Sequence, residues 1–356
     1  MTERQGMDTA ARGRHLLTRI RARTSAARRR ARFLASIRHL HGPRRLSMGA
    51  QDVAVVALVR DGAFYLDGFF RHYRVIGARH FVFFDNGSTD GTLARIREEP
   101  GTVIVQSTLP WGGFENDFRR YAAEHFLRGH WCLYADMDEH FDFDGSAQVG
   151  LGGLVSYLDA QGYTALVAQM LEMFPDAPLR DAAHIPYGEA IAGFRHCDVS
   201  AAIPAPYHSP DIAFEYLLRN NTLGNPAIGF LFGGIRGKVF GEHCCLTKHP
   251  LVKITGKMRP GVHPHCSSGV ACADFTALIR HYKFTNDPFG RDAALVAQNA
   301  IGHGEDRLRL AAVERHAGLS LMSPTAFAYN GLADLRERGF LIGSDRYADW
   351  LAGTDA

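Results

Sequence analysis

The sequence has no long hydrophobic run. No apolar stretch approaches the roughly 18 residues of a membrane-spanning helix, and none resembles a signal-peptide core. It also lacks a Cys-x-x-Cys pair, so we expect its six cysteines to be reduced, structural thiols. These absences predict a cytoplasmic protein. Its 356 residues, 46% of them hydrophobic and 22% charged, allow one large globular domain with appendages.

The first 49 residues have no lysine and only two acidic side chains, but they carry thirteen arginines. Apolar residues at helical spacing lie between the arginines, namely Leu16, Leu17, Ile20, Phe33, Leu34, Ile37 and Leu40. A basic amphipathic helix of this kind binds the surface of an anionic membrane, so we expect peripheral contact at its inner face. A solvated extension is the alternative. No aromatic or glycine-rich recognition motif accompanies the charge, and we expect no nucleic-acid partner.

From residue 51 onward, apolar strand-like runs alternate with helical patterns. The predicted strands are 52–59, 80–84, 103–106, 131–134 and 165–170, and the predicted helices are 63–76, 92–98, 116–127 and 151–158. This alternation predicts an α/β fold with a mostly parallel sheet covered by helices on both faces. Residues 172–235 are rich in Pro, Gly and His and are expected to form substrate-facing loops. We therefore divide the chain into a basic extension (1–49), a catalytic domain (50–290) and a helical C-terminal extension (291–356).

Polar side chains follow three of the predicted strands where those strands end: Arg60-Asp61, Asp85-Asn86, and the pair Asp136 and Asp138. The carboxyl ends of parallel strands lie at one edge of a sheet, and ligands bind outside that edge. The three polar groups are therefore expected to lie together at a binding site.

Asp136 and Asp138 are two residues apart at the end of an apolar run. On a continuous strand their side chains would share a face, about 6.7 Å apart along the chain. Like charges on one face repel each other unless a cation lies between them, and oxygen ligands suit Mg²⁺ or Mn²⁺. The pair therefore predicts a divalent-metal and nucleotide site.

Several short motifs occur in a fixed order between residues 52 and 285. They are residues 59–73, the loop Asp-Asn-Gly-Ser-Thr-Asp-Gly-Thr at 85–92, Asp-Met-Asp-Glu at 136–139, Gly-Gly-Ile-Arg-Gly-Lys-Val-Phe at 233–240, Thr-Lys-His-Pro-Leu at 247–251 and His-Tyr-Lys-Phe at 281–284. With these motifs the sequence resembles the family 2-like glycosyltransferases, especially the bacterial branch related to family 92. It departs from the family at Arg60-Asp61-Gly62, where Lys-Asn-Glu is usual.

The resemblance implies a GT-A fold and a metal-dependent, commonly inverting transfer from a nucleotide-sugar donor. It implies that Asp85 contacts the nucleotide base, that Asp136 reaches the ribose or a metal-bound water, and that Asp138 ligates the metal. Arg60, Asp61 and Asn86 would line the nucleotide-sugar site beside them.

Further candidates follow later in the chain. On a strand His281 and Lys283 would share a face, so one of them would ligate the metal while the other meets a phosphate. His265 is a second candidate ligand. Arg236 and Lys248 are candidates for binding the diphosphate, whose negative charge must be stabilised as it leaves.

An inverting transfer needs a carboxylate base that removes the proton from the acceptor hydroxyl. Asp198, Asp211, Glu215 and Glu242 all lie after the metal motif, where the acceptor loops are expected. The pattern does not select one of them.

The sequence thus predicts a hexosyltransferase that uses Mn²⁺ or Mg²⁺ and a nucleoside-diphosphate sugar, with UDP as the expected nucleotide. The acceptor would be a saccharide or lipid-linked molecule of cell-surface polysaccharide or glycolipid synthesis. Two alternatives remain open: a nucleotidyltransferase or metal-dependent phosphohydrolase that uses Asp136, Asp138 and His281, and a catalytically degenerate nucleotide-binding scaffold.

Overall fold

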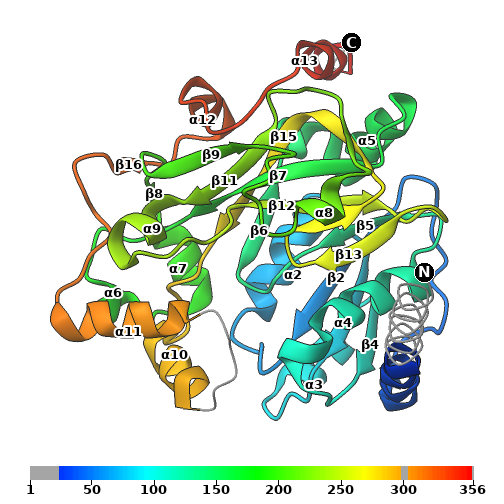
Figure 1. The fold of residues 1–356 in the computed structure, drawn as a ribbon, viewed down its shortest axis with the longest axis horizontal. Helices are drawn as coiled ribbons and strands as arrows, with labels where there is room; N and C mark the ends of the chain where they lie inside the picture. The colour runs from blue at the N-terminus through cyan, green and yellow to red at the C-terminus, as the bar shows by residue number, and fades with distance from the viewer. Residues whose placement is uncertain (1–23, 298–303, 355–356) are drawn as a thin grey trace, which may run out of the picture.

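A ten-stranded sheet runs through the molecule, with helices on both of its faces (Figure 1). The computed structural model describes residues 24–297 and 304–354. Leu16, Leu17 and Ile20, expected to be helical, lie outside the described residues. Among the described residues, no helix has the length and apolarity needed to cross a membrane. The fold is mixed α/β with a mostly parallel central sheet.

The order of the strands places a parallel block beside an antiparallel strand. From one edge the order is β1 (Arg38–His41), β4 (Thr102–Gln106), β3 (His80–Asp85), β2 (Val53–Val59), β5 (Trp131–Tyr134), β12 (Thr247–Lys253), β7 (Ala165–Glu172), β15 (Ala271–His281) and β10 (Thr222–Leu223), and β6 (Glu139–Asp142) pairs with β15. Strands β4, β3, β2 and β5 are parallel, whereas β12 is antiparallel to both β5 and β7. The five predicted strands are confirmed; β12, β15 and β6 were not predicted.

Alternate side chains of the central strands enter two separate cores. In β2, Val55 and Ala57 belong to the cluster that includes α2 (Leu66–Val75) and α5 (Ser146–Ala160). Ala54 and Val56 belong to the cluster that includes α4 (Trp111–Phe126). Because both faces are covered, the strands are apolar throughout, which is why their sequences show no alternation. The expected helix at 92–98 is α3 (Thr92–Glu98).

The remaining elements are short and lie around the sheet. They are α6 (Leu179–Ala182), α7 (Tyr187–Gly193), β8 (His196–Cys197), β9 (Ala202–Pro206), α8 (Glu215–Leu218), β11 (Gly229–Gly233), α9 (Gly234–Phe240), β13 (Arg259–His263), β14 (Cys266–Ser268), α10 (Pro288–Ala297), α11 (Glu305–Arg315), β16 (Phe327–Ala328), α12 (Leu332–Glu337) and α13 (Asp345–Gly353). The expected loop region 172–235 thus contains small helices and the antiparallel pair of strands β9 and β11, and the C-terminal segment is mainly helical as predicted.

Part of the expected N-terminal extension (1–49) belongs to the folded domain. Residues 24–36 form a helix, and residues 38–41 of the expected extension form β1, which pairs with β4 at the edge of the sheet. Phe33 anchors the helix, because its side chain is buried among Phe84, Phe114 and Phe118. Phe33 of this segment therefore contributes to the core of the domain.

His249 of β12 is a buried, uncharged imidazole. Its ring stacks on Tyr207, whose hydroxyl lies 3.0 Å from Nε2, and the Ser267 amide donates to Nδ1 at 3.4 Å. Burial lowers the pKa of His249 to about 4. If Nδ1 were protonated, it could no longer accept the hydrogen bond from the Ser267 amide, and two N–H groups would face each other.

His249 should therefore make the fold sensitive to acid. Its folded-state pKa lies below the unfolded value of about 6.5, so its contribution is present above pH 6.5 and is lost as pH falls toward 4, up to ~3 kcal/mol. We expect His249→Phe to lower stability at neutral pH but to flatten this acid dependence, measured by urea unfolding at about pH 7 and pH 4.5. An unchanged acid dependence in the variant would contradict the assignment.

Candidate active site

The Asp-Met-Asp-Glu segment is a turn between two strands and not a continuation of β5. Strand β5 ends at Tyr134 and β6 begins at Glu139, and the Glu139 amide donates to the Asp136 carbonyl at 3.1 Å. The expectation that Asp136 and Asp138 share one strand face is therefore wrong. The turn directs the two carboxylates to different partners.

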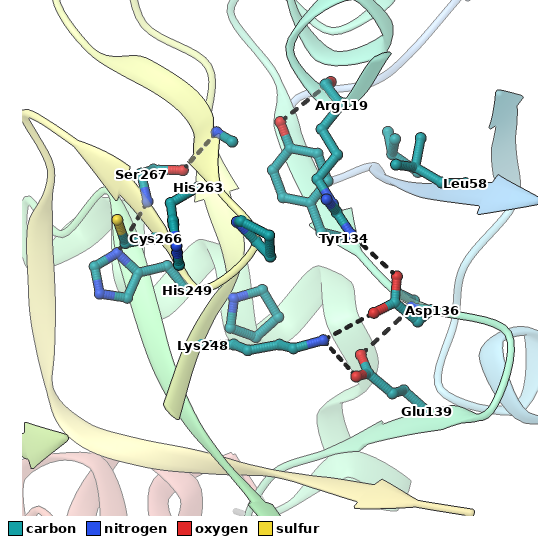
Figure 2. Close-up of a pocket in the computed structure, with 15 residues that line it drawn as sticks. Leu58, Arg119, Tyr134, Asp136, Glu139, Lys248, His249, His263, Cys266 and Ser267 are labelled. Carbon is teal, nitrogen blue, oxygen red and sulfur yellow. Dashed lines mark hydrogen bonds and ion pairs between the residues drawn. The ribbon is translucent and has the colours of Figure 1, made fainter. Parts of the chain in front are cut away.

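Asp136 is held by two cations from distant segments. Lys248 Nζ of β12 lies 2.9 Å from Oδ2, and Arg119 Nη2 of α4 lies 3.4 Å from Oδ1. Lys248 also contacts the buried Glu139 carboxylate, so one ammonium bridges two carboxylates (Figure 2). Burial opposes ionisation of Asp136, but Lys248 and Arg119 outweigh it and hold its pKa below the usual range. By contrast, burial and the neighbouring Asp136 raise the pKa of Glu139, although Lys248 opposes this.

Asp138 faces His281, the last residue of β15. Oδ2 of Asp138 lies 3.5 Å from Nε2 of His281, and Nδ1 of the same ring lies 3.1 Å from Oε2 of Glu172 at the end of β7. The strand register causes this arrangement, because His281 is paired with Glu172 on one side and with Glu139 on the other. Burial would lower the pKa of His281, but Glu172 and Asp138 outweigh it and raise the pKa to about 9.

Asp138 and His281 offer an oxygen and a nitrogen ligand that suit a divalent metal ion. With Nδ1 held by the Glu172 carboxylate, the ring presents Nε2 toward the Asp138 carboxylate, an arrangement that orients metal-binding histidines. Among the described residues, no cluster of three or more His, Cys, Asp or Glu side chains could hold an ion. A metal at Asp138 and His281 would therefore need further ligands from substrate or water, as Mg²⁺ and Mn²⁺ commonly do.

The other two predicted ligands have different surroundings. Both Asp136 oxygens are engaged by Lys248 and Arg119. His265 lies 3.0 Å, through Nδ1, from the Thr247 carbonyl, and burial together with Lys248 lowers the pKa of His265 to about 3.

The predicted nucleotide-binding loop is held by its own carboxylates. Asp85 is fully buried and accepts hydrogen bonds from the Gly87 and Ser88 amides and from Gln106. Asn86 donates to two backbone carbonyls, of Ser107 and Leu109. These side chains shape the loop.

The first strand end joins the same loop. Asp61 accepts a hydrogen bond from the Thr89 amide at 2.6 Å, which ties the end of β2 to the loop after β3. Arg60 is exposed beside it, with Nε 3.9 Å from Oδ2 of Asp61. The expected convergence of these two strand ends is confirmed.

Of the predicted cations, Lys283 interacts with Asp138, and Arg236 interacts with Lys283 and Glu172. The Lys283 amide donates to Oε1 of Glu172. Burial and the charge of Arg236 lower the pKa of the Lys283 ammonium, and the Asp138 carboxylate acts to raise it. Arg236 is itself buried, and its Nε has no hydrogen-bond partner among the described residues.

Arg236 belongs to a buried ionic cluster that includes one of the predicted bases. Glu242 contacts Arg236 through Oε2 and accepts from Arg309 of α11 at 2.9 Å through Oε1. Arg309 also forms two bonds to Asp292 of α10, at 2.6 and 2.7 Å. Glu242 therefore neutralises two buried guanidinium groups.

The remaining base candidates differ in their surroundings. The Asp198 carboxylate is buried, with Lys238 at 2.8 Å and hydroxyls of Ser323 and Thr325 around it. Burial opposes ionisation, but Lys238 and these hydrogen bonds lower the pKa of Asp198 overall. Asp211 is exposed and accepts from Ser209 at 3.3 Å, and Glu215 pairs with Arg219 on α8.

Two small cavities are each lined by one of the carboxylates paired with His281 in the sheet, Glu139 or Glu172, but by neither Asp138 nor His281. The first is lined by residues that include Asp136, Glu139, Lys248 and Arg119 (Figure 2). The second is lined by residues that include Glu172, Asp198, Gly233, Gly234 and Arg236. Glu139 and Glu172, which connect these groups, were not predicted. Glu139 is the first residue of β6 and Glu172 is the last residue of β7, but only the pairing of these strands with β15 reveals that they flank His281.

The separate environments of the two aspartates predict unequal effects on metal binding. We expect Asp138→Asn to weaken Mn²⁺ binding most, and Glu172→Gln to weaken it by about 10–100-fold because the imidazole loses its orienting partner. Asp136→Asn should change it little, because Lys248 and Arg119 already engage Asp136. Calorimetric titration of the protein with Mn²⁺ measures this. Equal weakening by Asp136→Asn and Asp138→Asn would contradict the prediction.

The buried cluster predicts that Glu242 is structural. Glu242→Gln removes the shared carboxylate of Arg236 and Arg309, which keep Glu305 and Asp292 respectively, so we expect a loss of about 1.5–3 kcal/mol in urea unfolding. Glu215→Gln, which removes an exposed pair on one helix, serves as the control and should cost about 0.5 kcal/mol or less. If Glu242→Gln kept full stability and lost only turnover, the base assignment would be favoured instead.

Comparison with known proteins adds little to this geometry. No protein-family model matches the chain, and no curated protein is similar to it in sequence. Among solved structures, HddC from Yersinia pseudotuberculosis is similar over 67% of this chain and 96% of its own, with 6% identity and a TM-score of 0.31. A likeness at that score supports no conclusion about fold family or activity.

Proposed function

We propose that this chain is a metal-dependent glycosyltransferase with a GT-A fold. It would move a sugar from a nucleoside-diphosphate sugar, expected to be UDP-linked, to a saccharide or lipid-linked acceptor with inversion. The observation that carries the proposal is the Asp138–His281 pair, oriented by Glu172 at the end of β7. The parallel block β4–β3–β2–β5, followed directly by the Asp-Met-Asp-Glu turn, supports the fold assignment.

Lys283, which interacts with Asp138, and the neighbouring Arg236 favour an anionic substrate. Burial and Arg236 lower the pKa of Lys283. Glu242 and Glu305 contact Nη2 of Arg236, but its buried Nε has no hydrogen-bond partner among the described residues, so an anion that reached Nε and Lys283 would satisfy both. A diphosphate meets this requirement, and both side chains would stabilise its charge as it leaves. A divalent ion bound by Asp138 and His281 would supply further neutralisation of the same leaving group.

Asp136 and the loop after β3 would bind the nucleoside. The Asp136 side chain remains 38% exposed despite its two cationic partners and lines the first cavity. Its ionised carboxylate is a suitable acceptor for ribose hydroxyls. Asp85 and Asn86 would act on the base mainly by fixing the loop, since their polar atoms already bond within it.

Of the base candidates, Asp211 fits a proton-abstracting role better than Asp198, Glu242 and Glu215, and the last of these is paired with Arg219. A carboxylate whose pKa is lowered by a cation is a weak base, which applies to Asp198. Glu242 is enclosed by two arginines. Asp211 is exposed and hydrogen-bonded only to a serine hydroxyl in the described part of the chain.

The direct test is donor turnover. Purified full-length protein with Mn²⁺ and a panel of nucleotide sugars should release nucleoside diphosphate from one donor, measured by chromatography. We expect Asp138→Asn to lower kcat/KM about a thousandfold, or ~4 kcal/mol, because the leaving diphosphate loses its main stabilisation. Asp67→Asn, on an exposed ion pair with Arg95, is the control and should have no effect.

Other outcomes would identify the alternatives. Release of pyrophosphate or inorganic phosphate without sugar transfer would favour a nucleotidyltransferase or phosphohydrolase. Nucleotide binding without turnover of any donor would favour a scaffold. If no donor is turned over and Asp138→Asn leaves nucleotide affinity unchanged, the glycosyltransferase proposal is wrong.

A further inference from the structure

The N-terminal helix (residues 24–36) is fixed to the domain by one face. Phe33 packs against the rings of Phe114 and Phe118 in α4. One turn earlier, Arg29 contacts the Asp117 carboxylate, and its guanidinium lies 4.6 Å from the centre of the Phe114 ring. These contacts set the rotation of the helix, because positions i and i+4 lie on the same side. In Figure 1 the helix lies beside α4 and β4.

The opposite face of this helix is apolar and exposed. Ala27, Ala31 and Leu34 follow the spacing i, i+4, i+7 and therefore form one stripe, turned away from Phe33. All three are exposed, and 47% of the Leu34 surface is accessible. An exposed leucine on a helix that is otherwise anchored has no packing role within the described residues.

Arg28 and Arg30 border this stripe, and Arg32 lies on the helix between Arg28 and the anchored Arg29. Arg28, Arg30 and Arg32 are exposed, and none of the three forms an ion pair with residues 24–297 or 304–354. In residues 24–49 there are seven arginines and no acidic residue. The positive charge extends toward α4, where burial and the nearby His39, Arg44 and Arg45 lower the pKa of His125.

We infer that the N-terminal helix is a docking surface for an anionic lipid bilayer. The stripe of Ala27, Ala31 and Leu34 would enter the interface between headgroups and acyl chains, while Arg28, Arg30 and Arg32 contact the lipid phosphates. The apolar stripe distinguishes this occupant from nucleic acid, whose phosphates require positive charge but no exposed leucine. Docking needs no donor or acceptor, so it stands independently of the proposed transfer.

Co-sedimentation of the full-length chain with vesicles tests the inference. We expect binding to vesicles of phosphatidylglycerol and phosphatidylcholine, but not to vesicles of phosphatidylcholine alone. The triple variant Arg28→Gln, Arg30→Gln, Arg32→Gln should lower the partition coefficient about 100-fold, since each basic residue near the surface contributes roughly a factor of five. Thermal melting confirms that each variant is folded.

Two further variants separate docking from a general charge effect. The triple variant Arg95→Gln, Arg97→Gln, Arg338→Gln removes the same charge from exposed arginines elsewhere and should bind as the parent does. Leu34→Gln should also weaken binding, and its effect should persist at high salt, where that of the arginines fades.

Equal loss in both triple variants would overturn the inference. So would equal binding to neutral and anionic vesicles, or binding to duplex DNA or RNA without binding to vesicles. Nucleotide-sugar turnover measured on soluble substrates should not change in any of these variants, so a failure of docking is distinct from a failure of the proposed activity.

Discussion

The need to neutralise buried carboxylates organises the centre of this molecule. Asp136, Asp138, Glu139 and Glu172 lie together where the central strands end; Glu139 and Glu172 are buried, and an isolated buried carboxylate is strongly disfavoured. Lys248 and His281 each contact two of them. Neither cation is local: Lys248 lies 112 residues after Asp136, and His281 lies 109 residues after Glu172. The site can therefore form only when distant strands are already in register.

The antiparallel strand β12 makes this compensation possible. It lies between β5 and β7 and brings Lys248 to the end of the neighbouring strands, while β15 ends at His281 beside β7. As a result, Asp136 and Asp138 lie in different electrostatic environments although they are two residues apart. Asp136 and Glu139 share an ammonium with a fixed positive charge, whereas Asp138 faces an imidazole that could also act as a metal ligand. Sequence spacing alone would treat the two aspartates as equivalent.

Elements whose structure is determined by neighbouring residues could be predicted from the sequence, whereas elements that depend on contacts between distant strands could not. Strand β2 and helix α3 were predictable because apolar runs, glycines and capping residues lie within a few residues of each other. Strand β12 was not, since its segment Lys248-His249-Pro250 reads as a polar loop and becomes a strand only through pairing on both sides. Similarly, Asp85 has the residue type of a ligand, but its hydrogen bonds to Gly87 and Ser88 can be known only from the backbone path. The roles of Glu139 and Glu172 depend on strand register, which the sequence does not display.

The carboxylate of Glu242 also has a consequence for synthesis of the chain. Its two guanidinium partners are Arg236, nearby in sequence, and Arg309, which the ribosome adds 67 residues later. Until α11 has been synthesised, Glu242 can pair only with Arg236, and Asp292 lacks its partner Arg309. The region around Arg236 should then complete its folding after most of the chain has been translated, which makes the C-terminal helices the last step of maturation.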